Sequence, residues 1–264
     1  MPHTAQAAVS AERARTYNER ARRHGLRSSA WWGTADAIAD RHRQANEYGR
    51  RHRVRHWRHP TATAIRNAVK DLGVATADEM VLAFLKAELA SHRWPHLHQQ
   101  VRVHGLRAVV ESPDLTDATQ NRIRAALLQC YRGYGANAAL FAGFPTDVAW
   151  RRMEIDHTEL SMFRYAKDKD VCAASGPGRR VIDAARNVAD GKAPAAFSTN
   201  VDAVADRTRN GESFPELIAV DDGGGGFILV EGHTRAAAYV LAKPIYPIGV
   251  LIGSSPNMSE WAYF

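Results

Sequence analysis

The feature that most constrains this chain is a run of alternating apolar and polar segments towards its C-terminal end. Two apolar segments rich in strand-forming residues, 216–220 and 227–230, are separated by Asp-Asp-Gly-Gly-Gly-Gly at 221–226. A short glycine-rich linker between two such segments is typical of a β-hairpin. A polar box, Glu231 to Arg235, follows the second segment, and the alanine-rich run 236–241 after it favours a helix. The sequence therefore predicts strand, hairpin, strand, polar box and helix, in that order.

The polar box lies at a strand-to-helix junction, where the backbone N–H groups of the first helical turn have no intrahelical partners. Those groups and the helix dipole together favour an anion. Gly232 lets the backbone approach a ligand closely, while Thr234 and Arg235 add a hydroxyl and a guanidinium. We therefore expect the box to bind phosphate. The alternative is that Thr234 only caps the helix and Arg235 only pairs with a surface carboxylate.

The residues after the predicted helix continue the pattern. Lys243 and Pro244 end the helix, and 245–252 predicts a third strand. This order of elements, with Glu-Gly-His-Thr-Arg at its centre, resembles the ParB N-terminal / sulfiredoxin-like superfamily. The resemblance is firm over 214–252 and extends back to about Trp150, but it does not reach the first half of the chain.

The resemblance implies a mixed α/β domain in which a Gly-x-x-Arg box binds nucleotide phosphates. The superfamily includes CTP-dependent DNA-partition clamps, sulfinic-acid reductases and kinases that phosphorylate free serine. His233 stands where the reductases carry their reactive cysteine, which disfavours reductase chemistry. The box is closest to Asp-Gly-His-His-Arg, the form found in the free-serine kinases, with Glu231 in place of the aspartate.

A second group of residues that could hold an anion precedes the helix predicted over 181–189. Its members are Ser175, Gly176, Arg179 and Arg180. Alone, this segment is an ordinary loop. Beside the polar box, it could close on the same phosphates.

Catalytic groups can also be named. A kinase needs a carboxylate that accepts the proton of the attacking hydroxyl, and Asp168, Asp170 and Glu231 are the candidates. His233 could contact a phosphate oxygen, or it could be a structural histidine that hydrogen-bonds the hairpin.

Basic charge is concentrated in the first 60 residues. The chain of 264 residues has a formal net charge of +7, whereas residues 1–60 hold thirteen Arg and five acidic residues, an excess of +8. Residues 13–58 could therefore contact nucleic-acid phosphates, although an acidic partner or a solvated helix surface would also fit. The chain has no apolar run long enough to span a membrane and no signal-peptide core, and its two cysteines fit a reducing compartment. We expect a soluble cytoplasmic protein without membrane contact.

Helical patterns dominate the segment before residue 145. Thr76 and Glu79 match a capping box ahead of an apolar helical face. An earlier face, which Gly73 closes, predicts another helix; it consists of Ile65, Val69 and Leu72. Four histidines could bind a metal only if the fold brought them together, and we predict no metal site there; they are His92, His96, His98 and His104.

The domain boundary is predicted where the helical pattern breaks. A helix over 117–132 would place Cys130 in the core, the break follows at 142–147, and 150–155 predicts a strand. We expect an α+β protein. A basic, His- and Arg-rich helical domain would occupy residues 1–145, and a ParB/sulfiredoxin-like mixed α/β nucleotide-binding domain would occupy residues 146–264.

Three functions are compatible with these features. The favoured one is a Mg²⁺-dependent phosphotransferase that uses ATP or ADP, with CTP as a further option, and acts on a small hydroxylated metabolite such as an amino acid. The second is a DNA-binding, nucleotide-gated clamp or nuclease of ParB type, which the basic segment supports but the lack of a following helix-turn-helix pattern opposes. The third is a non-catalytic nucleotide-binding regulator.

Overall fold

Six strands form one mixed sheet in the computed structural model, which describes residues 70–91 and 94–264. The strands are β1 (Lys70–Ala75), β2 (Ala149–Ile155), β3 (Arg164–Tyr165), β4 (Leu217–Asp221), β5 (Phe227–Glu231) and β6 (Ile248–Ser254). Their order across the sheet is β1-β2-β6-β4-β5-β3. β3 runs parallel to β5 and β4 parallel to β6, while the remaining neighbours are antiparallel. With the helices described next, this sheet confirms the predicted α+β class.

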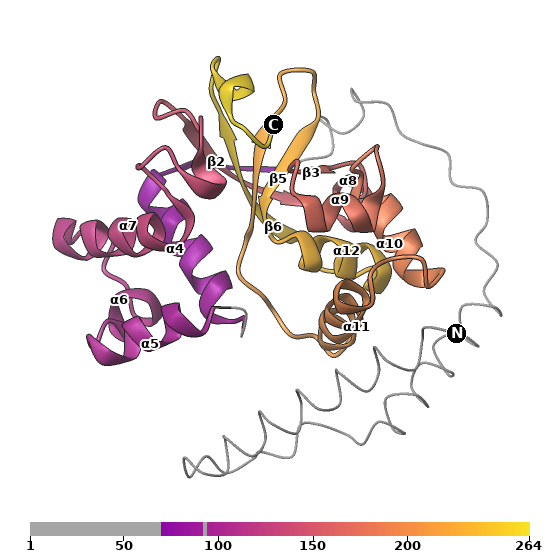
Figure 1. Cartoon of the computed structure of the whole chain (residues 1–264), viewed down its shortest axis with the longest axis horizontal. Coiled ribbons are helices and arrows are strands. Elements are labelled where there is room, and N and C mark those ends of the chain that lie inside the picture. The colour runs from indigo at the N-terminus through magenta and orange to yellow at the C-terminus, as the bar shows by residue number, and fades with distance from the viewer. Residues whose placement is uncertain (1–69, 92–93) are drawn as a thin grey trace, which may run out of the picture. The chain divides into compact units, whose positions relative to one another are not determined.

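Helices cover both faces of the sheet (Figure 1). One face carries α8 (His157–Leu160), α9 (Lys169–Ser175), α10 (Val181–Ala189), α11 (Ala195–Arg209) and α12 (His233–Ala242). The other face carries α4 (Ala77–Leu89), α5 (Pro95–Val103), α6 (Arg107–Glu111), α7 (Ala118–Arg132) and the short 3₁₀ helices η1 (Ala139–Phe141) and η2 (Met258–Glu260). No helix among the described residues is long and apolar enough to cross a membrane.

The central strands are apolar on both sides because both of their faces are covered. In β4, Leu217 and Ala219 pack into the core under α8–α12, whereas Ile218 and Val220 pack into the core under α4–α7. β5 alternates in the same way, and all of its first four residues are buried. Continuous apolar runs of this kind are typical of strands buried on two faces. They explain why both segments could be predicted from sequence.

Several predicted elements are confirmed with their caps. Thr76 accepts a hydrogen bond from the Glu79 N–H while Glu79 binds the Thr76 N–H, which is the predicted capping box of α4. α7 begins at an Asp117 cap and ends at Gly133, whose φ of 80° is left-handed. The predicted hairpin joins β4 to β5, and α12 ends at Lys243 before Pro244.

Two local predictions were wrong. The residues around Leu72, predicted to end a helix at Gly73, form β1, because pairing with β2 supplies the hydrogen bonds and a bulge between Asp71 and Gly73 accommodates the irregular pattern. Cys130, predicted to be in the core, is exposed. The buried face of α7 instead carries Arg124, Leu127 and Leu128.

The predicted domain boundary at residue 145 lies between α7 and β2. Among the described residues, β1 and α4–α7 share a sheet and a core with the later strands. Residues 1–69, including the basic segment 13–58, lie outside the described residues. The division into domains 1–145 and 146–264 therefore stays a prediction.

Candidate functional site at the ends of β3 and β5

Two parallel strands end side by side at the polar box. Arg164 and Tyr165 of β3 pair with Ile228 and Leu229 of β5, and the Ala166 N–H continues the ladder by donating to the Leu229 carbonyl at 3.2 Å. β3 leads into α9 and β5 leads into α12. The carboxyl ends of parallel strands, where helices begin, are the usual place for ligands in α/β sheets. The fold therefore gathers the polar box and the segment around 167–170 at one edge.

Gly232 makes the turn from β5 into α12. Its φ of 95° is left-handed, and a Cβ at this position would lie 2.3 Å from a methyl carbon of Leu217 and 3.2 Å from the Arg235 guanidinium. Both the conformation and the packing thus require glycine. As the N-cap residue of α12, Gly232 has no side chain that could accept hydrogen bonds from the N–H groups of the first turn. Internal packing therefore explains this glycine without a ligand.

The sequence predicts that Arg235 binds phosphate, but in the structure its side chain points into the protein. It is 8% exposed, pairs with Glu231, and donates to the backbone carbonyl of Pro215 and, at 3.4 Å, to that of Glu216. In this arrangement its guanidinium holds the start of β4 against the end of β5. Glu231 is engaged by the same contact.

His233 packs against Tyr165. Its Nε2 lies 3.2 Å from the Leu229 carbonyl, which can only accept, so this nitrogen is the donor of the hydrogen bond. The ring centroids of His233 and Tyr165 are 5.3 Å apart, and the Tyr165 hydroxyl donates to the His233 carbonyl at 3.1 Å. Burial raises the pKa of Tyr165, which keeps the hydroxyl protonated. The hydrogen bond to β5 fits the structural role considered for His233.

The loop before α10 lies along the outer edge of β3. The backbones of Arg179 and Tyr165 are joined by an N–H to carbonyl bond of 2.7 Å, and the Arg179 side chain donates to the Tyr165 carbonyl at 3.0 Å. Burial and the charge of Arg164 lower the pKa of Arg179, and no carboxylate of the described residues pairs with it. Arg180, in contrast, pairs with Asp183.

The other predicted members of this loop have structural partners. The Ser175 hydroxyl donates to the Val171 carbonyl within α9, and Gly176 ends that helix with a φ of 74°. Arg179 is therefore the member whose charge the loop leaves uncompensated.

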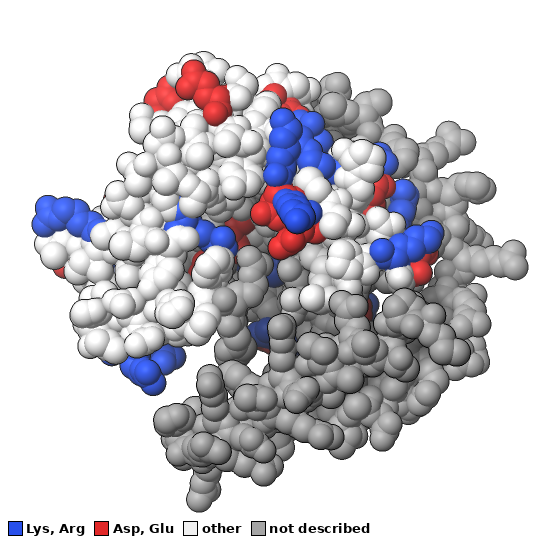
Figure 2. All heavy atoms as spheres, in the orientation of Figure 1, with Lys and Arg blue, Asp and Glu red and all other residues white. Residues whose placement is uncertain are grey.

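The predicted carboxylates occupy the start of α9. Asp168 caps the helix, since its Oδ1 accepts from the N–H groups of Asp170 at 3.0 Å and Val171 at 3.4 Å. Asp170 is exposed in the first turn, and the exposed Lys167 precedes the cap. Lys167 makes no ion pair with any residue that the structure describes. Figure 2 shows Lys and Arg side chains gathered on the β3 and α8–α10 side of one face, with acidic side chains between them.

Sequence reasoning did not single out Tyr165 or Lys167 as site residues. Tyr165 is the last residue of a two-residue strand, and so short a strand has no periodic signal. Sequence reasoning also missed Arg152, which binds Glu216 at 2.8 Å and Glu79 at 2.9 Å next to the backbone that Arg235 holds. These two ion pairs raise the pKa of Arg152 despite partial burial, with the Glu216 hydrogen bond contributing most.

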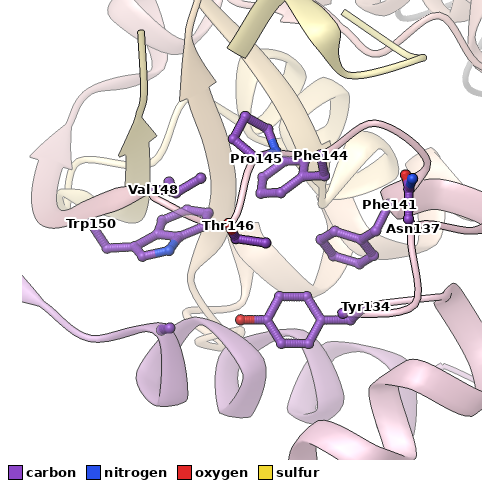
Figure 3. Close-up of a pocket in the computed structure, with 10 residues that line it drawn as sticks. Tyr134, Asn137, Phe141, Phe144, Pro145, Thr146, Val148 and Trp150 are labelled. Carbon is purple, nitrogen blue, oxygen red and sulfur yellow. The ribbon is translucent and has the colours of Figure 1, made fainter. Parts of the chain in front are cut away.

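No group of three or more His, Cys, Asp or Glu side chains that could hold a metal ion occurs in 70–91 or 94–264. The structure has a cavity of about 210 Å³, lined by residues near the start of β2 and by the loop before it (Figure 3). β2 is antiparallel to β6, β6 is parallel to β4, and β4 is antiparallel to β5, so β2 and β5 run in the same direction. The start of β2 and the end of β5 therefore lie at opposite ends of the strands. The cavity is therefore separate from the polar box.

Comparison with known proteins adds no family assignment. No protein-family model and no curated protein matches this sequence, and no solved structure matches the fold. The resemblance to the ParB/sulfiredoxin-like superfamily thus rests on the order of elements and on the residues of the box.

Proposed function

We propose that the chain binds a nucleoside di- or triphosphate, ATP or ADP with CTP as a further option, through its phosphates at the shared edge of β3 and β5. The observation that carries this proposal is the parallel pairing of these two strands. It puts the N-terminus of α12 beside the Lys167 segment. A helix N-terminus at the carboxyl edge of parallel strands, with uncompensated basic side chains nearby, suits a phosphate group.

The residues that would hold the phosphates follow from their partners. Thr234 is half-buried in the first turn of α12, and its hydroxyl makes no hydrogen bond with the described residues. Lys167 and Arg179 supply cations that no described carboxylate neutralises. We assign Arg235 a positioning role, in which it fixes the Gly232 turn through Glu231 and the Pro215 carbonyl.

The proposed reaction is phosphoryl transfer to a small hydroxylated metabolite such as an amino acid. Bound Mg²⁺ would offset the charge of the phosphates. The base must be a carboxylate at the same edge that is not neutralised by a cation. Glu231 is paired with Arg235, whereas Asp168 uses one oxygen as a cap and Asp170 is exposed. We therefore favour Asp168 or Asp170 over Glu231 as the base, and Arg179 as the partner of the acceptor's carboxylate.

Binding is tested by titrating the full chain with ATP, ADP and CTP in the presence of Mg²⁺ in a calorimeter. Lys167→Ala and Thr234→Val should each weaken binding of the preferred nucleotide by about 1–3 kcal/mol, the range for a hydrogen bond to a charged group. Lys86→Ala is the matched control, because Lys86 is an exposed lysine on α4, on the other face of the sheet. Absence of heat with all three nucleotides would refute the proposal, as would equal losses in Lys167→Ala and the control.

Transfer is tested separately by phosphorus NMR after incubation with nucleotide and a panel of amino acids. The expected result is a phosphorylated amino acid whose formation is lost in Asp168→Asn or Asp170→Asn and retained in Glu231→Gln. If nucleotide binds but no acceptor is phosphorylated, the protein is a regulator or a clamp and the kinase assignment fails.

A further inference from the structure

A cavity with aromatic walls lies at the opposite end of the strands from the proposed phosphate site. It opens between the first turn of α4 and the segment 134–150 that leads from α7 into β2 (Figure 3). Its walls include Tyr134, Phe141, Phe144 and Trp150, and Ala77 lies at its rim. We propose that this cavity is a binding site for a small planar aromatic molecule of one ring or two fused rings.

The aromatic walls are held in place by the surrounding fold. Trp150 is 4% exposed and packs so closely on β6 that a Cβ at Gly253 would come within 2.9 Å of the indole. Phe141 is in edge contact with both Tyr134 and Phe144, with ring centroids 5.1 Å apart in each pair. Phe144 lies nearly parallel to Trp150, at an interplanar angle of 14°. A ligand would therefore meet preformed ring faces and edges.

The loop that carries these rings keeps a conformation that most residues avoid. Asn137 and Ala139 have φ angles of 50° and 47°, in the left-handed region, although neither is glycine. The Asn137 side chain accepts from the Gly143 N–H, and a Cβ at Gly143 would collide with the Glu260 carbonyl at 2.1 Å. Backbone strain that the surroundings enforce in this way is concentrated at functional sites.

The cavity also has a polar group that the fold does not use. The Tyr134 hydroxyl makes no hydrogen bond with any described residue, and Figure 3 shows it directed towards Trp150 across the cavity. Burial, with a smaller effect of the Asp78 charge, raises the pKa of Tyr134, so the hydroxyl is protonated at neutral pH and can donate or accept. Tyr134 is half-buried and lines the cavity, so its hydroxyl can pair with a polar group on a ligand there.

The size and lining of the cavity define the ligand class. An apolar cavity of about 150 Å³ holds benzene, and drug-sized ligands need about 300 Å³ or more. A cavity of about 210 Å³ therefore suits one ring or a fused pair. Four aromatic walls favour a flat ring over a saturated one, and the Tyr134 hydroxyl favours a ring that bears one polar group.

Indole is a suitable probe because it is a fused pair of rings with one N–H group. Ligand-observed saturation-transfer NMR on the full chain with millimolar indole should show transfer to the ring protons. Ala77→Leu should abolish the transfer by filling the rim, at an exposed position in the first turn of α4 where leucine is tolerated. Tyr134→Phe, which keeps the ring and removes the hydroxyl, should weaken indole binding about two- to tenfold.

Two controls make the outcome decisive. Cyclohexanol, a saturated ring with a hydroxyl, should bind more weakly than indole, and equal binding would overturn the aromatic preference. Lys86→Leu, an apolar substitution elsewhere on α4, should leave indole binding unchanged. The proposal is wrong if the unmodified chain shows no saturation transfer, or if Ala77→Leu binds indole as well as the unmodified chain does.

Discussion

Replacing Arg235 with methionine separates the two roles that this residue could have. If the guanidinium contacts phosphate, the substitution weakens nucleotide binding and leaves the fold intact. If it holds the interior contacts seen here, the substitution destabilises the fold. The Arg235 and Glu231 side chains are only 10% and 19% exposed, so solvent screens their interaction little.

The expected loss of stability follows from the contacts removed. A hydrogen bond to a charged group contributes about 1.5–3 kcal/mol, and breaking a buried ion pair costs about 3–5 kcal/mol. Methionine recovers part of this by packing its chain where the arginine stem lay. We expect Arg235→Met to lower the free energy of unfolding by about 3 kcal/mol, which for a unit of this size corresponds to a melting temperature lower by about 6–12 °C.

The partner residue and a surface control complete the design. Glu231→Gln keeps the shape and should cost about 1–2 kcal/mol, and the double variant should cost less than the sum of the two single variants. Arg209→Met removes an ion pair whose members are 50% and 73% exposed, and it should change stability by about 0.5 kcal/mol or less.

The assay is thermal unfolding of the full chain by far-UV circular dichroism, with nucleotide calorimetry below the transition. A melting temperature for Arg235→Met equal to that of Arg209→Met, together with lost nucleotide binding, would refute the reasoning. It would mean that in solution Arg235 serves the ligand and not the fold.

Three further predictions concern other parts of the chain. Thr76→Ala removes the α4 capping box and should lower the free energy of unfolding by about 1 kcal/mol in a urea titration, whereas an unchanged urea midpoint would mean that the cap contributes nothing. Although burial opposes it, backbone hydrogen bonds from the glycine hairpin and the charge of Arg164 hold the pKa of Asp222 below its ordinary value. Its stabilisation is therefore complete above about pH 4 and is lost as the pH falls through the folded-state pKa. Asp222→Asn should be about 1 kcal/mol less stable at pH 7 and should approach the unmodified chain as the pH falls below 4 in urea titrations, while a gap independent of pH would contradict this assignment. Finally, if residues 1–60 bind duplex DNA, affinity measured by fluorescence anisotropy should fall steeply with salt and vanish when the segment is deleted, and undiminished binding by the deleted chain would exclude that role.

The central part of the fold could be predicted because its signals are local. Continuous apolar strands, a glycine hairpin, an alanine-rich helix and a capping box each carry their own pattern within a few residues. β1 could not be predicted this way, because its partner β2 lies far along the chain and pairing overrides the weak helical pattern around Leu72.

The candidate site was predictable in position but not in detail. The strand-to-helix junction identified the box. The direction of the Arg235 side chain, however, depends on its hydrogen bond to the carbonyl of Pro215, which lies just before β4 and 20 positions away in the sequence. The aromatic cavity depends on loop conformations at Asn137 and Ala139 that no periodic pattern encodes. Contacts between distant segments are what sequence reasoning lacks.

The connection between β1 and β2 has a consequence for the order in which the protein folds. Lys70 pairs with Glu154 across 84 positions, whereas β4 and β5 are joined by a short hairpin. Closing a long loop costs more chain entropy and slows the formation of the contact. We therefore expect the segment from β4 to β6 to form first and β1 to join the sheet late, as the outermost strand beside β2. Pulse-labelled hydrogen exchange during refolding should then show amides of β5 protected before those of β1, and the reverse order would contradict this expectation.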